Sequence, residues 1–303
     1  MNISNIHNCY GCGVCAMTCA KKIIDIRLNN EGFYEPIITD ISKCTDCGLC
    51  REGCSYCHDE LASPPSFVEG YGSWSNEDGV RRKSSSGGTG YEIGRYLIKE
   101  GYDIVGVRYD VQKNIAEHYI AHTQEELIQS MGSKYIPSYT LDAFKKIDRK
   151  KKYLVTGTPC QIDSFRRYIK KFRCEDNFVL LDFFCHGVPS YLVWEQYRKY
   201  LKDRYNIENF DKINFRDKTK SWHRYYINIA KEGKIIYEKN NDNDLFYKAF
   251  FDNILLNTSC QNCEFRKNYS RADIRLGDYW GKRYSNREDG VSAILVLNSN
   301  GQM

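Results

Sequence analysis

Two runs of four cysteines with the same internal spacing lie in the first 54 residues of this 303-residue chain. The first run is Cys9, Cys12, Cys15 and Cys19, and the second is Cys44, Cys47, Cys50 and Cys54. Each run reads C-x2-C-x2-C-x3-C, a spacing that indicates ligation of 4Fe-4S clusters, whose irons prefer soft thiolate ligands. One run could arise by chance or bind zinc, but two favour iron and sulfide. The chain is therefore expected to carry single electrons.

This spacing is the ligand pattern of bacterial ferredoxins, in which the fourth cysteine of each run binds the cluster of the other run. We therefore assign one cluster to Cys9, Cys12, Cys15 and Cys54, and the other to Cys44, Cys47, Cys50 and Cys19. The usual proline after the fourth cysteine is missing, since Ala20 and Ser55 stand in its place. Cys57 falls outside the spacing and is interpreted as a bystander. Residues 1–60 are thus predicted to form a small ferredoxin-like domain with two clusters, called the head below.

Later cysteines form a second set, in which Cys260 and Cys263 are a C-x2-C pair. Cys160 and Cys185 each follow an expected strand. Because strand ends of an α/β sheet meet at one edge, these four thiols could converge there. Their spacing alone leaves buried single cysteines and a zinc site open as alternatives.

The elements that position these residues change character after the head. Residues 61–70 contain Pro64 and Pro65 and are predicted to be a linker. Residues 71–303, called the body below, alternate strands and helices and predict a mixed α/β domain. Strands are expected at residues 102–109, 153–156, 178–184, 272–278 and 291–297, with antiparallel strands over 212–239 and a turn at 232–234. Helices are expected at residues 161–172, from Pro189 to about residue 205, and at 244–256.

Composition excludes several classes of protein. The 14 cysteines are clustered in a chain much longer than a secreted disulfide scaffold. No signal peptide and no apolar stretch near 20 residues is present, so we expect a cytoplasmic protein without a membrane span. The net charge is +5, with five basic and eight acidic residues in the first 60. An acidic head on a basic body does not indicate nucleic-acid binding.

Eight short motifs occur in an order that resembles one known family. They are SSSGGTG (84–90), IVGVRY (104–109), GSKY (132–135), GTPCQ (157–161), FCHGVP (184–189), NFRD (214–217), CQNCEF (260–265) and LGDYWG (276–281). Together they resemble the coenzyme F420 hydrogenase/dehydrogenase beta-subunit family, whose members are iron–sulfur flavoproteins. The resemblance implies FAD and a third 4Fe-4S cluster in the body, held by Cys160, Cys185, Cys260 and Cys263. Cys174 matches no motif.

The same resemblance implies where the flavin would bind. Residues 84–90 precede an expected helix and look like the flavin phosphate loop, with Ser86, Gly87, Gly88 and Thr89 as contacts. Ser133 and Lys134 resemble a second flavin-contacting stretch, and Thr158 and Asp278 are weaker candidates at strand ends. Outside the resemblance, the Ser/Gly run is usually a flexible loop, and Lys134 could be a surface lysine. No G-x-G-x-x-G motif follows a strand, so direct NAD binding by that route is not supported.

The predicted function is electron transfer between 4Fe-4S clusters and FAD, with an unidentified two-electron substrate at the flavin. No protein nucleophile is expected. The substrate could be the deazaflavin coenzyme F420 or a compound of surface-polysaccharide metabolism. The expected partners are a ferredoxin or another redox protein and a small-molecule electron donor or acceptor. The alternative is a non-catalytic subunit that relays electrons to a partner enzyme. Family members often run longer, so a missing C-terminal segment is a further open alternative.

Overall fold

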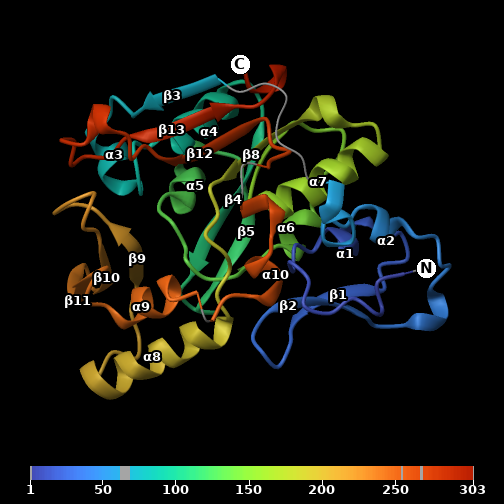
Figure 1. Ribbon diagram of the computed structural model, residues 1–303, viewed down its shortest axis with the longest axis horizontal. Coiled ribbons are helices and arrows are strands. Elements are labelled where there is room, and N and C mark those ends of the chain that lie inside the picture. The colour runs from blue at the N-terminus through green and yellow to red at the C-terminus, as the bar shows by residue number, and fades with distance from the viewer. Residues whose placement is uncertain (1, 62–68, 254, 267–268, 303) are drawn as a thin grey trace.

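The computed structural model describes residues 2–61, 69–253, 255–266 and 269–302. An eight-stranded mixed sheet forms the centre of the body (Figure 1). In spatial order its strands are β3 (Glu69–Ser73), β13 (Ser292–Val296), β12 (Ile274–Asp278), β8 (Phe178–Phe183), β7 (Tyr153–Thr156), β4 (Asp103–Asp110), β5 (Ile115–Ala121) and β6 (Ser138–Tyr139). The central strands β12, β8, β7 and β4 are parallel neighbours. Antiparallel pairs lie to either side of them, at β3–β13–β12 and at β4–β5. Because parallel strands share one direction, the four central strands all end at the same edge of the sheet.

Helices cover both faces of this sheet, which explains why the central strands β7 and β8 are mostly apolar and buried. On one face, α7 (Pro159–Lys171) and α6 (Leu141–Phe144) place Phe165 and Phe144 against Val155 and Leu180. On the other face, α4 (Thr89–Lys99) and α5 (Gln124–Leu127) pack apolar side chains such as Leu97 against the strands. The helix α3 (Asp78–Lys83) lies between β3 and α4 along the chain. The body is therefore a layered α/β domain.

The head packs directly on the body. It consists of the antiparallel hairpin β1 (Ile24–Leu28) and β2 (Tyr34–Ile38) with the short helices α1 (Val14–Thr18) and α2 (Leu49–Glu52). Its own apolar core includes Ile24, Ile26 and several of the cysteines. The helix α1 also contacts α6 and α7, so that Cys12 and Val14 belong to the same buried cluster as the α7 face of the large sheet. This contact fixes the cysteine loop against the start of α7.

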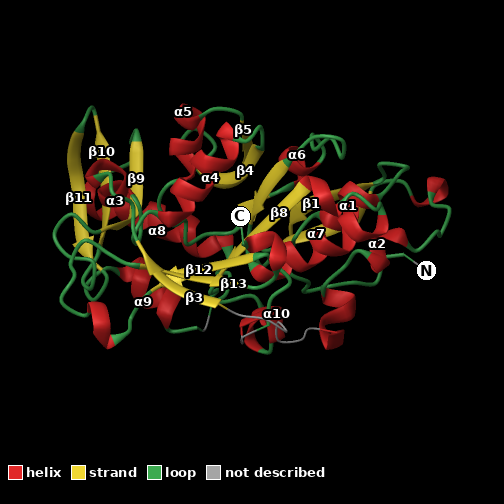
Figure 2. Ribbon diagram, turned by 90° about the horizontal axis from the view of Figure 1, so that it is seen from above, coloured by secondary structure: helices red, strands yellow, loops and turns green. Residues whose placement is uncertain are grey.

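A second sheet lies at the end of the molecule opposite the head (Figure 2). It is formed by β9 (Lys212–Asp217), β10 (Tyr226–Lys231) and β11 (Lys234–Asn240), in antiparallel order. The helices α8 (Tyr191–Tyr205) and α9 (Leu245–Phe251) pack on it through Trp194 and Phe246. The chain then returns toward the head through the short helix α10 (Thr258–Gln261) (Figure 1).

Most of the expected elements are present, and four boundaries differ for identifiable reasons. Pro189 is not the first helical residue, because Ser190 caps α8 through its hydroxyl and the helix begins at Tyr191. The helix expected over 244–256 ends at Phe251, two residues before Asn253, which has a φ of 61°. The helix expected at 161–172 begins earlier, at Pro159, because Thr158 and Gln161 form a capping box there. Most of the expected linker, at 62–68, lies outside the described residues, but residues 69 and 70 belong to β3, where they pair with β13.

Candidate functional site

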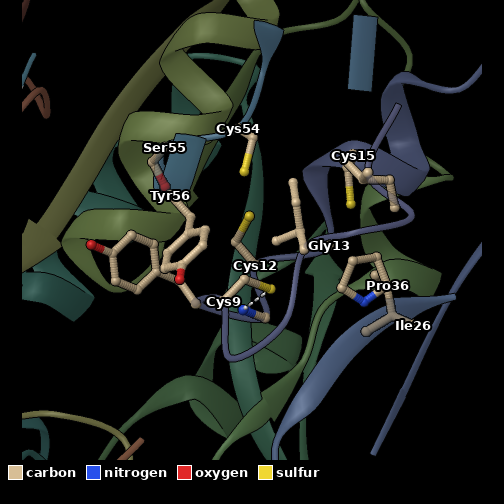
Figure 3. A pocket seen from close by; sticks show the side chains of 13 residues that line it. Cys9, Cys12, Gly13, Cys15, Ile26, Pro36, Cys54, Ser55 and Tyr56 are labelled. Atoms are coloured by element: carbon tan, nitrogen blue, oxygen red, sulfur yellow. Dashed lines mark hydrogen bonds between the residues drawn. The ribbon is translucent and has the colours of Figure 1, made fainter. Parts of the chain in front are cut away.

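Four head cysteines line one cavity, although one of them comes from the second cysteine run. Cys9, Cys12 and Cys15 come from the loop and first turn of α1, and Cys54 follows α2. Figure 3 shows the sulfur atoms of Cys12 and Cys54 pointing toward one another, with those of Cys9 and Cys15 facing the same space. The structure thus brings together the four residues that the sequence assigned to one cluster.

Three of these thiols have raised pKa values, because burial and neighbouring thiols disfavour their thiolate form. Burial raises the pKa of Cys9 to about 12, and it raises the pKa of Cys15 well above its usual value, with Cys12 adding to both shifts. The pKa of Cys54 is raised by a hydrogen bond with Cys57 and then by burial. Crowded, desolvated thiols stay protonated on their own, whereas a bound metal cation stabilises them as thiolates. Cys57, interpreted from the sequence as a bystander, lies beside Cys54.

The two cysteine runs repeat a backbone conformation as well as a spacing. Gly13 and Gly48, directly before α1 and α2, both have a φ of 76°. Two positions earlier in each run, Gly11 and Asp46 also have positive φ, at 66° and 52°. A Cβ atom added at Gly11 would lie 2.6 Å from the carbonyl oxygen of Tyr34, so this turn requires glycine. Each run therefore turns in the same way around its first three cysteines.

Three cysteines of the second group assigned from the sequence lie in the core of the head, and the fourth is exposed. Cys19, Cys44 and Cys50 pack in the apolar core of the head. Cys50 has a raised pKa, chiefly because of burial and to a lesser extent because of Cys19. Cys47, by contrast, is exposed. Within the described part of the chain, no three cysteine, histidine, aspartate or glutamate side chains are close enough to hold a single metal ion.

The four body cysteines come together from three separate segments. Cys160 lies in the first turn of α7, Cys185 follows β8, and Cys260 and Cys263 lie in and just after α10. Burial raises the pKa of Cys160 well above its usual value, and the other three thiols raise it further. Burial likewise raises the pKa of Cys185 to about 12, with contributions from Cys260 and Cys263. Four mutually close, desolvated thiols again form a donor set suited to a 4Fe-4S cluster.

Two serines join the head cavity to the body cysteines. Cys12 Sγ lies 3.3 Å from Ser164 Oγ in α7, and the Ser164 hydroxyl donates to Ser55 Oγ at 2.8 Å. The Ser55 hydroxyl in turn donates to the carbonyl oxygen of Cys160 at 3.0 Å. Asn257 adds a further contact, because its amide donates to the carbonyl oxygen of Cys9 at 3.0 Å. The two cysteine sets are thus neighbours across a buried interface.

Tyr10 reinforces this junction from within the first cysteine loop. Its ring packs edge-on against Tyr56 of the head, at 5.4 Å, and against Phe265 of the body, at 6.0 Å. It belongs to the small buried cluster that contains Cys160, Cys263 and Phe265. A side chain between Cys9 and Gly11 therefore reaches the body cysteine set directly.

The loop expected to hold flavin phosphate lies at the carboxyl edge of the large sheet, but its polar groups have protein partners. The Gly87 N–H donates to Ser292 Oγ at 3.0 Å, and the Ser86 hydroxyl donates to the carbonyl of Val291 at 2.8 Å. Thr89 exchanges a hydrogen bond of 2.6 Å with Ser73. A Cβ atom at Gly87 would lie 2.3 Å from the carbonyl oxygen of Ser73, so this glycine serves packing against β3. Gly88, with a φ of 91°, precedes α4 as a helix cap without a side-chain hydrogen bond.

The other predicted flavin contacts lie near the same edge, and they differ in the protein groups that they bind. Ser133 hydrogen-bonds to Ser85 of the loop through its N–H and its hydroxyl, at 2.7 and 2.9 Å. Lys134 is turned inward, where its ammonium donates to three backbone carbonyls of residues 129–131, and burial lowers its pKa to about 7. Thr158 contacts Cys160 Sγ at 3.2 Å, beside the thiol set. Asp278 ends β12 and is bound by Arg216 and Trp222.

Two buried cations at this edge were missed by the sequence prediction. Arg216 donates to Asp278 Oδ2 at 2.7 Å, and Lys218 donates to the carbonyl oxygens of Ser86 and Asp289. Arg216 lies within the motif NFRD, to which the sequence prediction gives no role. A signal is present in the sequence, because two cations two residues apart on an expected strand point to the same face. Only the fold shows that this face meets the loop.

Two family descriptions match the body of the chain, and both describe the beta subunit of coenzyme F420 hydrogenase/dehydrogenase. Its N-terminal part matches residues 71–145, and its C-terminal part matches residues 150–303. The chain belongs to the coenzyme F420 hydrogenase/dehydrogenase beta-subunit family. This confirms the resemblance identified from the eight motifs. The matched residues of this family member include the loop at 84–90 and all four body cysteines, whereas the head lies outside them.

A solved structure supports the fold. The chain resembles a chain in the structure titled "Xenon derivatization of the F420-reducing [NiFe] hydrogenase complex from Methanosarcina barkeri", with 17% identity and a TM-score of 0.53. The similarity covers 80% of this chain and 78% of that one. Comparison with curated proteins gives no match. No helix in the described residues of this family member is long and apolar enough to cross a membrane.

Proposed function

We propose that this family member is an iron–sulfur flavoprotein oxidoreductase that passes electrons between the head and a flavin at the carboxyl edge of the large sheet. The observation that carries the proposal is the contact between the two cysteine sets through Ser55 and Ser164. When bound, 4Fe-4S clusters supply one-electron chemistry and FAD supplies two-electron chemistry. A chain that holds both kinds of group close together can couple one-electron and two-electron carriers.

The residues of the chain have separate tasks in this proposal. Cys9, Cys12, Cys15 and Cys54 would hold the head cluster nearest to the body, and Cys160, Cys185, Cys260 and Cys263 would hold the body cluster. Cys19, Cys44, Cys47 and Cys50 would hold the outer cluster of a ferredoxin-like head. The exposure of Cys47 supports an outer position, where a ferredoxin or another redox protein could approach.

The body cysteines and the candidate flavin residues occupy neighbouring strand ends. In the sheet β12 is next to β8, and β8 is next to β7. Asp278 ends β12, Cys185 follows β8, and Thr158 and Cys160 follow β7. Open α/β sheets bind ligands at this carboxyl edge. This arrangement supports a flavin site beside the body cluster, with a small two-electron substrate entering at the same edge.

Either the deazaflavin coenzyme F420 or a compound of surface-polysaccharide metabolism could be that substrate. The family name favours the first, and reduction assays with coenzyme F420, reduced ferredoxin and NAD(P)H as alternative electron donors separate the possibilities. Reduction of the bound flavin by reduced coenzyme F420 would support it. A flavin that accepts electrons from ferredoxin alone would argue against it.

One observation favours a second candidate, a subunit that relays electrons without a flavin of its own. The N–H of Gly87 and the hydroxyls of Ser86 and Thr89 are already bonded within the protein. Cofactor extraction from anaerobically purified protein distinguishes the candidates. Released FAD together with about twelve irons per chain supports the flavoprotein, because each 4Fe-4S cluster holds four irons. Iron without flavin supports the relay subunit, and stoichiometric zinc contradicts both.

A further inference from the structure

Arg216 and Lys218 place two buried positive charges at the carboxyl edge of the large sheet. Arg216 belongs to β9 and Lys218 follows it directly, so the two side chains leave the strand on the same side. Arg216 is 8% exposed and Lys218 is 5% exposed. Lysine and arginine are rarely buried to this degree without negatively charged partners.

Arg216 has donors to spare. Its Nη1 donates to Asp278 Oδ2 at 2.7 Å and lies 3.4 Å from the hydroxyl of Tyr135. Its Nε and Nη2 atoms are buried and have no hydrogen-bond partner among the described residues. The flat guanidinium also lies over the ring of Tyr225, with its carbon 4.5 Å from the ring centre. Because unpaired buried donors are costly, these two nitrogen atoms indicate a missing acceptor.

The surrounding charges leave the two cations undercompensated. Asp278 is shared between Arg216 and the indole N–H of Trp222, which lies 3.2 Å away. Lys218 binds carbonyl oxygens of Ser86 and Asp289, not a carboxylate. The carboxylate of Asp289 is already paired with Arg81 and with Arg287. The carboxylates of Asp278 and Asp289 therefore stand against the four cations Arg81, Arg216, Lys218 and Arg287, and the excess charge is positive.

The neighbouring backbone adds to this positive field. The carbonyl bonded by Lys218 belongs to Ser86, two residues before the Gly88 cap of α4. The helix has 11 residues, and its cap residue offers no side-chain acceptor to its first N–H groups. The N-terminal end of a helix favours an anion, and Arg216 supplies an independent reason to expect one.

We propose that Arg216 and Lys218 form a phosphate-binding site that holds the phosphate group of a nucleotide ligand at this edge. The identity of the ligand rests on the proposed function. In that function the bound nucleotide is FAD, and its pyrophosphate is the group that this site would hold. A guanidinium with two free N–H groups binds two phosphate oxygens, and the ammonium neutralises the charge. In this proposal Arg216 of β9 makes the phosphate contact that the sequence analysis assigned to Lys134.

Binding of four probes to flavin-depleted protein tests the site. The probes are FAD, FMN, riboflavin and inorganic pyrophosphate, and the variants are Arg216→Lys and Lys218→Met. The expected result is a loss of at least tenfold in affinity for FAD and for pyrophosphate in each variant, with riboflavin affinity unchanged because riboflavin carries no phosphate. Lys220→Met is the matched control, since Lys220 lies two residues further on and is 57% exposed. It should leave all four affinities as in the wild type.

The outcomes separate this inference from the proposed function. Loss of pyrophosphate binding with unchanged FAD affinity would keep the phosphate site but assign it to a different phosphorylated ligand. A wild-type protein that binds pyrophosphate but no flavin would contradict the proposed function and leave the site intact. Unchanged pyrophosphate affinity in both variants would overturn the site, and so would an equal loss for riboflavin. Arg216→Lys keeps a cation opposite Asp278, so a folded protein is expected, as checked by its thermal unfolding.

Discussion

The sulfur of Cys12 in the head lies 3.3 Å from the hydroxyl oxygen of Ser164 in the body, although 152 residues separate them in the chain. Ser164 is fully buried and holds a single hydroxyl proton. Its oxygen accepts from the N–H of Ser55 at 3.0 Å and from the Cys12 thiol, and its own proton goes to Ser55 Oγ. A thiolate at Cys12 would attract that proton. If Cys12 holds the proposed cluster, Ser164 acts on that cluster through Cys12 and is a positioning residue.

The first prediction concerns Ser164→Ala. Hydrogen bonds to cluster sulfur stabilise the more negative, reduced state, so the variant should lower the reduction potential of the cluster held by Cys12. The expected shift is roughly tens of millivolts, on a scale where about 59 mV is a tenfold change for one electron. An EPR-monitored redox titration measures it.

The control for this prediction is Ser130→Ala, which removes a hydroxyl that donates to the carbonyl oxygen of Leu127 and belongs to neither cysteine set. That variant should leave every potential unchanged. If Ser164→Ala changes stability but moves no potential, Ser164 is a packing residue and does not tune the cluster.

The second prediction concerns separable metal sites. Cys160→Ser removes one thiolate from the body set, which is distinct from the head cavity. The iron content should fall by about four per chain, with the head clusters retained. Iron analysis combined with EPR checks this. Cys174→Ser is the matched control, because Cys174 lies outside both sets, and its hydrogen bond goes to a backbone carbonyl. Loss of all iron in Cys160→Ser would show that the sites are not independent.

The third prediction is a pH dependence of FAD affinity. Burial lowers the pKa of Lys218 to about 8, and the charged groups that face it are Asp289, Arg216, Asp278 and Arg81. Phosphate binds the protonated ammonium, so affinity is retained below that pKa and lost as the pH rises through it. Between about pH 7 and pH 9 the affinity should fall about tenfold. Fluorescence titration with FAD measures this.

Lys218→Arg provides the control, because a guanidinium stays protonated across this range. The variant should bind FAD with nearly constant affinity from about pH 7 to about pH 9. A wild-type affinity that is flat over the same range would show that Lys218 does not face the phosphate.

The fourth prediction concerns stability in acid. His118 in β5 is buried, its Nε2 lies 3.3 Å from the carbonyl oxygen of Thr156, and burial lowers its pKa from 6.5 to about 4. The unfolded chain therefore binds a proton at His118 more readily than the folded chain does. The contribution of neutral His118 to the free energy of unfolding is full above about pH 6.5 and is lost as the pH falls toward 4. At about pH 5 the loss should be about 2 kcal/mol. Urea unfolding at about pH 7 and about pH 5 compares the wild type with His118→Gln, which should lack this part of the pH dependence. Equal pH dependence in both proteins would contradict it.

Most of the fold could be predicted from local patterns in the sequence. The strands at 153–156 and 178–183 are mostly apolar, with Thr156 and Asp182 as their polar residues, and a turn at residues 232–233 joins β10 and β11 as expected. The sequence did not reveal that β3 pairs with β13, because Glu69 to Ser73 has no apolar alternation and its partner strand lies in a distant part of the chain. Helix ends also escaped prediction where a cap decided them, as at Ser190.

For the cysteine groups as well, some contacts could be predicted from spacing and others only from the fold. Spacing predicted that Cys54 would join Cys9, Cys12 and Cys15, and the structure places these four around one cavity. Spacing carried no information on Ser164 or Arg216, because each acts through a tertiary contact with a distant segment. The motif GSKY predicts a flavin contact at Lys134, but its ammonium donates to backbone carbonyl oxygens, which only the fold reveals.

The measurement that tests the account most directly is the reduction of bound flavin by reduced ferredoxin in wild-type protein and in Cys54→Ser. Cys54 lines the head cavity and lies beside the interface with the body, so its loss should remove the inner head cluster without touching the body cysteines. The account predicts rapid bleaching of flavin absorbance in the wild type and a loss of at least tenfold in rate in the variant, with flavin content unchanged. Equal rates in the two proteins would contradict electron transfer through the head.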